Sequence, residues 1–323
     1  MANNYGTVAS ERNAQANGNP DVSEEGPLLG GSGKSSPSFT VRLRKHMSAP
    51  VSKSWADLVL LAGYAITGLL DSASISIWNV FVSMQTGRFP VSHPLLLLHI
   101  LQMTSTYALL SPLQPTRLTH PPGNSIYLGL GLSNPYASTK WIKSLISIAA
   151  FCFGSLLFAA FHRHCGGRRR YTLVLSYAFQ LVCIVGAALM VQLGPPHPPN
   201  EGPAESQNLT WVVALPLMLL AFQSSGQAIT SRVLSYNGLT SVVLTSNYCD
   251  LFADPELFTA GLTKNVVRNR RIGAPVLLLV GAVAGGFLSR SGLGMAAALW
   301  AAVVVKVGII AAWCLWKADA EEA

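Results

Sequence analysis

A single acid lies inside an apolar stretch of this chain, within the run GLLDSASISIW. Asp71 is the only acidic residue in the interior of an apolar block between residues 57 and 249. A charged side chain at the middle of a bilayer costs about 2.5–3.5 kcal/mol on insertion scales, so such a residue usually faces a cavity or a partner. Asp71 could therefore bind a substrate or carry a proton. The alternative role is structural: Asp71 could cap a broken helix, or hydrogen-bond to Ser or Gln across a helix bundle.

Uncharged polar side chains accompany Asp71 in two places. One group follows it towards the end of the same block, and the other lies in a later block that contains AFQSSGQAIT. Both groups offer hydrogen bonds but little charge, which suits a neutral or zwitterionic solute, or proton coupling through Asp71. They could equally hold helices together. The candidate substrate-binding residues are Asp71, Ser72, Gln85, Thr86, Asn124, Gln223 and Gln227.

The sequence carries no signature of an enzyme. HExxH, GxSxG and Walker loop patterns are absent from it. Its 5 cysteines include no CxxC spacing, so neither a zinc site nor a disulfide framework is indicated. We therefore expect no catalytic residues, no metal and no cofactor.

The elements that must position these side chains are apolar blocks. Of the 323 residues, 50% are hydrophobic and only 11% are charged, whereas soluble domains carry about 25% charged residues. Most of the blocks approach the ~20 residues that an α-helix needs to cross a bilayer, and lipid offers the backbone no other partners. We expect an all-α, polytopic membrane protein with about six transmembrane helices. These spans are expected near residues 57–82, 143–161, 172–193, 210–230, 274–290 and 295–316.

Short basic runs between the blocks indicate the orientation. With six spans, the runs RLRKH, RRR and RNRR all fall on one side, which the positive-inside rule identifies as the cytosol. Both termini are then cytosolic, and the net charge of +8 needs no nucleic-acid partner. A leucine-rich stretch at 93–112 could form a seventh span, but it would move the later basic runs to the opposite side. We therefore favour six.

The membrane domain is expected to cover residues 54–317, between a disordered cytosolic tail at 1–53 and a short tail at 318–323. The first tail contains EEGPLLGG, in which Glu24 precedes Leu28 and Leu29 with the spacing of an acidic dileucine sorting signal. A sorting adaptor is therefore a candidate partner. The plasma membrane and the vacuole are the candidate locations.

An ordered set of residues in and after the first block resembles a known family. These residues are Gly68, Asp71, Ser72, Ala73, Phe81, Val82, Thr86, Gly87 and Asn124. Their order resembles that of the YoaK family of membrane proteins, the domain of unknown function numbered 1275 (DUF1275), and of its fungal branch in particular. The resemblance extends over about residues 54–316 and implies a transporter-like protein without indicating its substrate.

The chain departs from the family pattern at one point. Thr86 and Gly87 should adjoin Asn124, but residues 88–123 lie between them. This insertion contains no acid, is rich in Leu, Pro, Ser, Thr and His, and corresponds to a whole number of codons. It is interpreted as a retained intron or a gene-model error; a genuine lumenal loop is the alternative.

The first three blocks resemble the last three. FGSLLFAAFHR and VGAVAGGFLSR place Gly154 and Gly281 at the same distance from a following arginine, and Asp71 roughly matches Gln223. Two units of three spans must lie inverted relative to each other in the membrane, an arrangement that many secondary transporters use. Glycines are expected at helix breaks or close helix contacts: Gly68, Gly87, Gly154 and Gly281.

We expect the protein to transport a small solute, with proton coupling through Asp71 as an option. The alternative function is a membrane scaffold or assembly factor that transports nothing. Its expected partners are the lipid bilayer and an unidentified small molecule, and its oligomeric state is left open. Transport predicts that Asp71→Asn abolishes function in a folded protein, whereas a scaffold role predicts that this substitution is silent.

Overall fold

The computed structural model describes residues 38–53, 55–85, 123–136, 139–194, 210–259, 261 and 264–319. The chain divides into two units, residues 1–39 and 40–323. Only Ser38 and Phe39 of the first unit are described, so the architecture below is that of the second.

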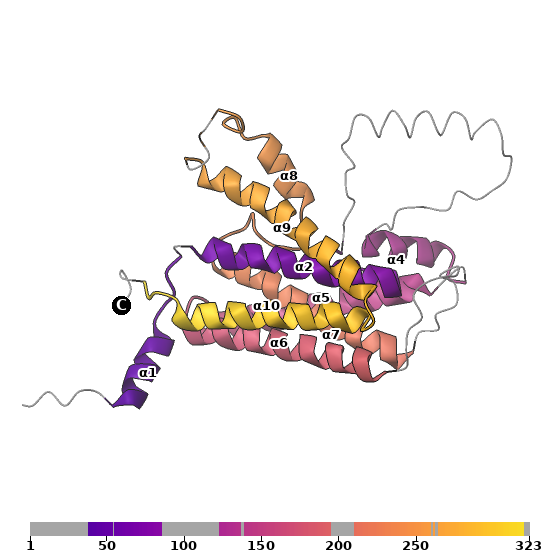
Figure 1. Ribbon diagram of the computed structural model, residues 1–323, viewed down its shortest axis with the longest axis horizontal. Coiled ribbons are helices and arrows are strands. Elements are labelled where there is room, and N and C mark those ends of the chain that lie inside the picture. Colours follow the sequence, from indigo (N-terminus) through magenta and orange to yellow (C-terminus); the bar gives the residue numbers. More distant parts are fainter. Residues whose placement is uncertain are drawn as a thin grey trace, which may run out of the picture. The chain divides into compact units, whose positions relative to one another are not determined.

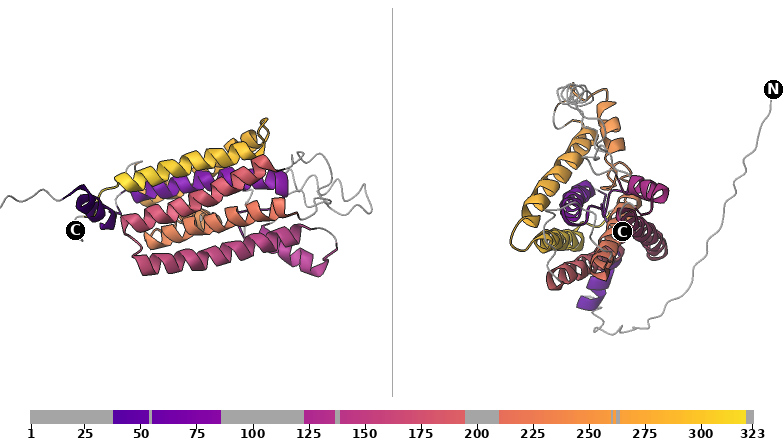
Figure 2. Two further views of the ribbon diagram at one scale, coloured as in Figure 1. Left: turned by 90° about the horizontal axis from the view of Figure 1, so that it is seen from below. Right: turned by 90° about the vertical axis from the view of Figure 1, so that its right-hand side faces the viewer.

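Within the described residues, six helices are long and apolar enough to cross a membrane. They lie side by side in Figure 1 and Figure 2, and the helical fold expected from the sequence is confirmed. The chain is therefore a multi-pass membrane protein. The six helices are α2 (Ala56–Trp78), α5 (Lys140–Cys165), α6 (Arg170–Leu193), α7 (Trp211–Val233), α9 (Val266–Ser289) and α10 (Met295–Leu315). Three shorter helices accompany them: α1 (Phe39–Ser48), α4 (Asn124–Ser133) and α8 (Thr245–Phe252).

Two of the long helices differ in extent from the apolar blocks. Helix α2 ends at Trp78, whereas the block continues to residue 82, because Asn79 adopts a left-handed conformation with φ of 56°. Helix α9 begins at Val266, before its block, because the side chain of Asn265 accepts a hydrogen bond from the Arg268 N–H at 2.8 Å. The basic run RNRR therefore forms the first turns of this helix.

Helix α1 lies inside the region expected to be a disordered tail, residues 1–53. Its ten residues, FTVRLRKHMS, place apolar and basic side chains at helical spacing. None of them is buried. The structure thus differs from the expected tail over these residues, while residues 1–37 lie outside the described part of the chain.

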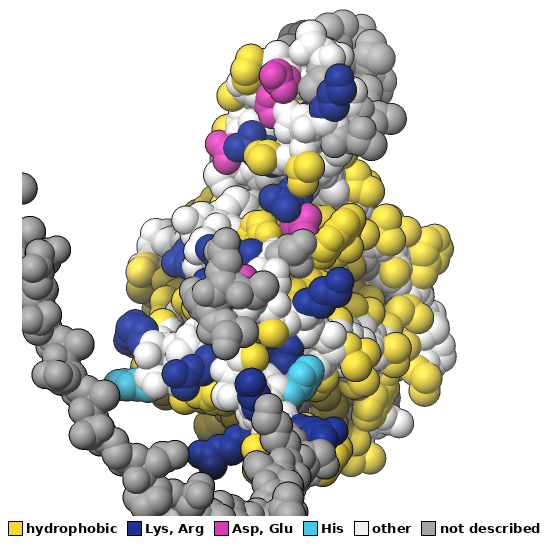
Figure 3. Space-filling model, turned by 90° about the vertical axis from the view of Figure 1, so that its left-hand side faces the viewer, with side chains coloured by type: hydrophobic (Ala, Val, Ile, Leu, Met, Phe, Trp, Pro, Cys, Tyr) yellow, Lys and Arg dark blue, Asp and Glu magenta, His cyan; other side chains and the backbone are white. Residues whose placement is uncertain are grey.

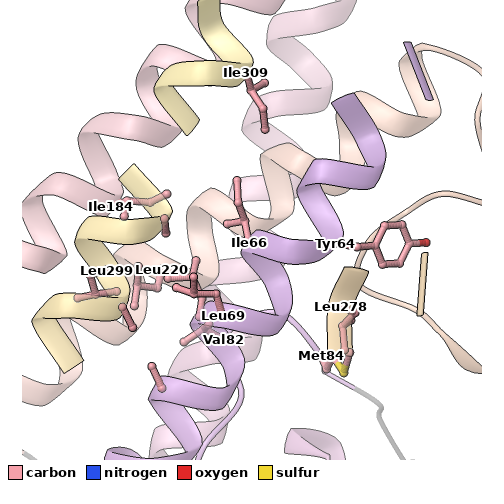
Figure 4. Packing of buried hydrophobic residues seen from close by; sticks show 14 of the residues in the cluster. Tyr64, Ile66, Leu69, Val82, Met84, Ile184, Leu220, Leu278, Leu299 and Ile309 are labelled. Atoms are coloured by element: carbon pink, nitrogen blue, oxygen red, sulfur yellow. The ribbon is translucent and has the colours of Figure 1, made fainter. Parts of the chain in front are cut away.

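The long helices pack in a definite order. Helix α2 lies against α9, and α5 lies against α7; α6 contacts both α7 and α10, and α10 closes the bundle against α2. In Figure 4, Ile66 of α2 points to the side where Leu220 of α7 and Leu299 of α10 lie. Because lipid tails are as apolar as these side chains, the helices are held by close packing and polar contacts more than by exclusion of water.

Basic residues gather at one end of the bundle. Figure 3 looks onto the end that carries α1 and the last residues of α10, and Lys and Arg side chains are spread over it. The starts of α6 and α9 contribute RRR and RNRR there. The positive-inside rule predicts that this end faces the cytosol.

Candidate functional site

The chain does not leave the bundle after α2 but folds back into it. Residues 79–85, called here the first return segment, have no regular helix or strand structure. Val80, Phe81, Val82 and Met84 are all at most 4% exposed. Backbone groups inside a bilayer need partners from the protein, so the contacts of this segment determine how it is held.

Asp71 provides the partners on one side. Its Oδ1 accepts hydrogen bonds from the N–H groups of Val82 and Ser83, each at 2.8 Å, and its Oδ2 accepts from Met84 at 3.2 Å. Asp71 lies seven residues before the end of α2, roughly 10 Å back along the helix axis. Both carboxylate oxygens are thus engaged in holding the backbone. These contacts fit the structural alternative for Asp71.

Asn124 holds the other side of the first return segment, partly through Gln85 at the end of that segment. The amide of Asn124 donates to Phe81 O at 2.7 Å and to Gln85 Oε1 at 2.8 Å. Ser147 of α5 donates to the same Phe81 carbonyl at 2.8 Å. The side chains of Asp71, Asn124 and Gln85, all selected from sequence, therefore meet around one segment. Ser147 was missed, because a lone serine in an apolar block carries no distinguishing signal.

A second return segment follows α7. Residues 234–244 turn at Ser235, whose φ is 66°, and run back along the bundle with Leu239 and Ser241 buried. Gln227 of α7 contacts the segment by donating to Ser241 Oγ at 2.9 Å. The same amide nitrogen lies 2.7 Å from Gly63 O and 3.2 Å from Thr67 Oγ1, both on α2.

Lys306 is the charged residue that sequence reasoning missed. It lies in the middle of α10 and is fully buried. Its Nζ donates to Gln227 Oε1 at 3.0 Å and Gln223 Oε1 at 3.3 Å, and lies 4.9 Å from the centre of the Tyr177 ring. The signal was present, since a lone lysine in an apolar run is as unusual as Asp71. Gln223 and Gln227 therefore accept the hydrogen bonds of this buried ammonium group.

The two return segments meet at a cavity of about 190 Å³. Ser224 of α7 joins the two halves here by donating to Val82 O at 3.1 Å. Its walls come from both segments and from α5 and α7: Ser83, Gln85, Phe151, Ser155, Ala228, Ile229, Arg232, Val242 and Val243.

Glycines make equivalent close contacts in the two halves. A Cβ at Gly154 on α5 would clash with Ser225 Oγ on α7, and one at Gly285 on α9 would clash with Ser72 Oγ on α2. Each serine donates to the carbonyl three residues before it, at 2.6 Å for Ser225 and 3.1 Å for Ser72. The carbonyl in each pair, that of Phe222 or Leu69, also lies against the glycine.

The order of packing repeats in the same way. Exchanging α2, α5 and α6 for α7, α9 and α10 converts each major contact into another one that is present. The short helices repeat the pattern, since α4 packs on α5 and α8 on α9. In Figure 1, α4 lies at the end of the bundle away from α1, and α8 lies beside α9. An inverted repeat of three spans predicts this pattern.

Two more of the glycines selected from sequence lie where α2 and α9 touch. Gly281 faces the Ala65 carbonyl, and Gly68 faces that of Leu278. The residue of the second half that is structurally equivalent to Gly154 is therefore Gly285, which lies one turn beyond the expected Gly281.

Some of the residues selected from sequence lie outside the described part of the chain. These are Thr86, Gly87, most of the insertion 88–123, and the candidate sorting residues Glu24, Leu28 and Leu29. Among the described residues, no three His, Cys, Asp or Glu side chains are grouped so that they could hold a metal ion.

Comparison with known proteins identifies the family. Neither the curated proteins nor the solved structures include a match to this chain. A family model described as "Protein of unknown function (DUF1275)" matches residues 116–312, more than half of the 323 residues. The match begins within the insertion, so it is shorter at its start than the resemblance expected over residues 54–316. The chain belongs to the DUF1275 family.

Proposed function

We propose that this protein transports a small polar solute through the cavity between its two return segments. The observation that carries the proposal is the meeting of two unwound segments, one from each half, at that cavity. Secondary transporters built from inverted repeats place their sites where interrupted helices meet near the middle of the membrane.

The cavity walls favour a small solute with hydrogen-bonding groups. Ser83, Gln85 and Ser155 offer hydroxyl and amide groups, and Arg232 is the charged residue among those that line it. The remaining walls are apolar. Asp71 serves this site indirectly in the proposal, because it holds the segment that carries Ser83.

A scaffold or assembly factor is the rival function. It needs the return segments only as rigid packing, and it predicts no path to the cavity from both sides of the membrane. Access to the cavity therefore separates the two functions without knowledge of the solute.

The test is two-sided labelling of a cysteine in the cavity. Ser155→Cys is made in a variant that lacks the five native cysteines, and the protein is reconstituted in phosphatidylcholine vesicles. A membrane-impermeant maleimide is then applied from the outside or trapped inside. Transport predicts that Ser155→Cys is modified from either side, because an alternating site opens to each in turn.

Leu156→Cys is the matched control. Leu156 is adjacent in sequence but 70% exposed on the lipid-facing side of the helix and does not line the cavity, so the reagent should not modify it from either side. Labelling of Ser155→Cys from one side only, or from neither, would contradict transport and favour the scaffold.

A further inference from the structure

A second hollow lies at the basic end of the bundle, apart from the cavity. It has a volume of about 570 Å³. The connection between α1 and α2 lines it with Ser48 and Pro50, and the loop between α5 and α6 lines it with Gly166, Gly167, Arg168 and Arg169. Val233 at the end of α7 completes it.

Buried Arg170 holds the walls of this hollow together. Its guanidinium group is 1% exposed and donates to the backbone carbonyls of His46 in α1 and Trp316 after α10. The backbone N–H of Arg170 donates to Ala49 O at 3.1 Å, and the backbone N–H of Val51 donates to Arg168 O at 2.8 Å. The α1–α2 connection, the α5–α6 loop and the end of α10 are thereby fixed relative to one another.

The two arginines that line the hollow differ in their contacts. Arg168 forms an ion pair with Asp319. Arg169 is exposed. The hydrogen bonds that join the walls come from the Arg170 side chain and not from that of Arg169. Helix α1, which leads into the lining residues Ser48 and Pro50, carries the exposed Arg42 and Arg44. Figure 3 shows this face with many basic side chains around it.

Helix α1 also exposes apolar side chains beside its basic ones. Leu43 is 48% exposed, and Met47 lies four residues further along the same side of the helix. An amphipathic helix with basic and apolar faces, placed directly before a membrane span, suits the boundary between headgroups and acyl chains. The hollow and α1 therefore both lie where the phosphate groups of the cytosolic leaflet are found.

We propose that this hollow binds the phosphorylated headgroup of an anionic phospholipid of the cytosolic leaflet, with Arg169 as its principal contact and α1 lying on the same leaflet. Guanidinium groups bind phosphate oxygens through paired N–H groups, which suits them to this ligand. Basic pockets at the cytoplasmic ends of membrane helices are known to take such headgroups. This site is independent of the transport function proposed above.

The test compares two single-charge substitutions in the full-length protein. Arg169→Gln removes a charge from the hollow, and Arg163→Gln removes one from an exposed residue of α5 that does not line it. Binding of phosphatidylinositol monophosphate, added to the protein in phosphatidylcholine nanodiscs, is measured by native mass spectrometry. Arg169→Gln should weaken binding about fivefold, the effect of one basic residue near a charged leaflet, and Arg163→Gln should have little effect.

Three results would overturn the proposal. Equal losses in the two variants would show non-specific attraction to basic charge, and equal binding of phosphatidylcholine would show no headgroup preference. Displacement of the lipid by inorganic phosphate as readily as by the soluble inositol phosphate headgroup would indicate a free-anion site. Thermal melting of both variants checks the fold, and unchanged melting is expected because both arginines are exposed.

Discussion

The two halves of the membrane domain share a plan but hold their return segments by different chemistry. In the first half, a carboxylate accepts three backbone N–H groups of the return segment. In the second half, the side-chain amide of Gln227 donates to Ser241 of its segment, and the same amide accepts a hydrogen bond from the buried ammonium group of Lys306. The first segment is thus held by its backbone N–H groups, whereas the second is held through side chains, since the Tyr236 hydroxyl also donates to Lys53 O at 2.9 Å.

This difference suggests unequal roles for the two segments. Three charge-assisted hydrogen bonds to consecutive N–H groups leave the first segment little freedom. The second segment is held at Ser241 by Gln227, whose amide is shared with Gly63 and Thr67 of α2 and accepts from Lys306. We expect the second segment to be the one that moves when the cavity changes its access.

The largest effect is expected at Asp71. Each buried N–H left without an acceptor costs about 1–3 kcal/mol, so Asp71→Ala should lower the melting temperature strongly. Asp71→Asn should be milder, because its remaining oxygen can still accept from Val82 and Ser83. Thermal melting in detergent measures both. If both variants melt like the wild type, the carboxylate does not hold the segment and its role is chemical instead.

The next effect is expected at the pair of Gln227 and Lys306. Gln227→Ala should destabilise the fold, since a hydrogen bond to a charged group contributes about 1.5–3 kcal/mol. Lys306→Met should be neutral or stabilising, as replacement of a buried charge by an apolar side chain often is. The double variant should show that Gln227→Ala costs less once Lys306 is absent. Additive losses in unfolding free energy would show that the two residues act separately.

Lys306→Met also separates stability from function. A chain of contacts that positions the second segment predicts normal melting but altered two-sided labelling of Ser155→Cys. Unaltered labelling in this variant would show that the lysine plays no part in access to the cavity.

Smaller and equal effects are expected at the paired glycines. Gly154→Ala and Gly285→Ala each place a methyl group against a serine hydroxyl and a carbonyl, and overpacking typically costs about 1–3 kcal/mol. Gly286→Ala is the matched control, because a Cβ there meets nothing within 4 Å. Melting temperatures that fall for Gly285→Ala but not for Gly154→Ala would break the equivalence of the two halves.

The smallest effect is expected from removing the insertion. Ser125 N donates to Gln85 O at 3.0 Å, so the chain on either side of the insertion already meets. After deletion of residues 88–123, Ser125 would follow Gln85 by four positions, which is the spacing of an α-helical hydrogen bond. The shortened protein should remain monodisperse and melt within a few degrees of the full chain. Aggregation of the deletion variant would show that the insertion is integral to the fold.

Composition and apolar length were enough to predict the helical fold, because a bilayer permits few structures. Asp71 was found for the same reason: a charge in an apolar run needs an explanation. Lys306 satisfies the same criterion, so the sequence alone marks it as clearly as it marks Asp71. The partners of Asp71 could not be predicted, because they depend on a chain that reverses direction after Trp78.

The repeat shows a second limit of sequence patterns. Gly281 and Gly285 lie one turn apart on the same face of α9, so either could be matched to Gly154 by spacing alone. Only the contacts with Ser72 and Ser225 identify Gly285 as the equivalent residue. Small residues at helical spacing predict a packing face well and its register poorly.

If the two halves lie inverted in the membrane, α4 is on the non-cytosolic side and α8 is in the cytosol. The most direct test uses one exposed position on each short helix: the native Cys249 of α8, or Ser133→Cys at the end of α4, each as the sole cysteine. An impermeant thiol reagent is applied to intact cells that carry the protein in the plasma membrane, and then to permeabilised cells. The inverted repeat predicts that Ser133→Cys reacts in intact cells and that Cys249 reacts only after permeabilisation. Reaction of both on the same side would contradict the inversion, and the reverse pattern would contradict the six-span orientation.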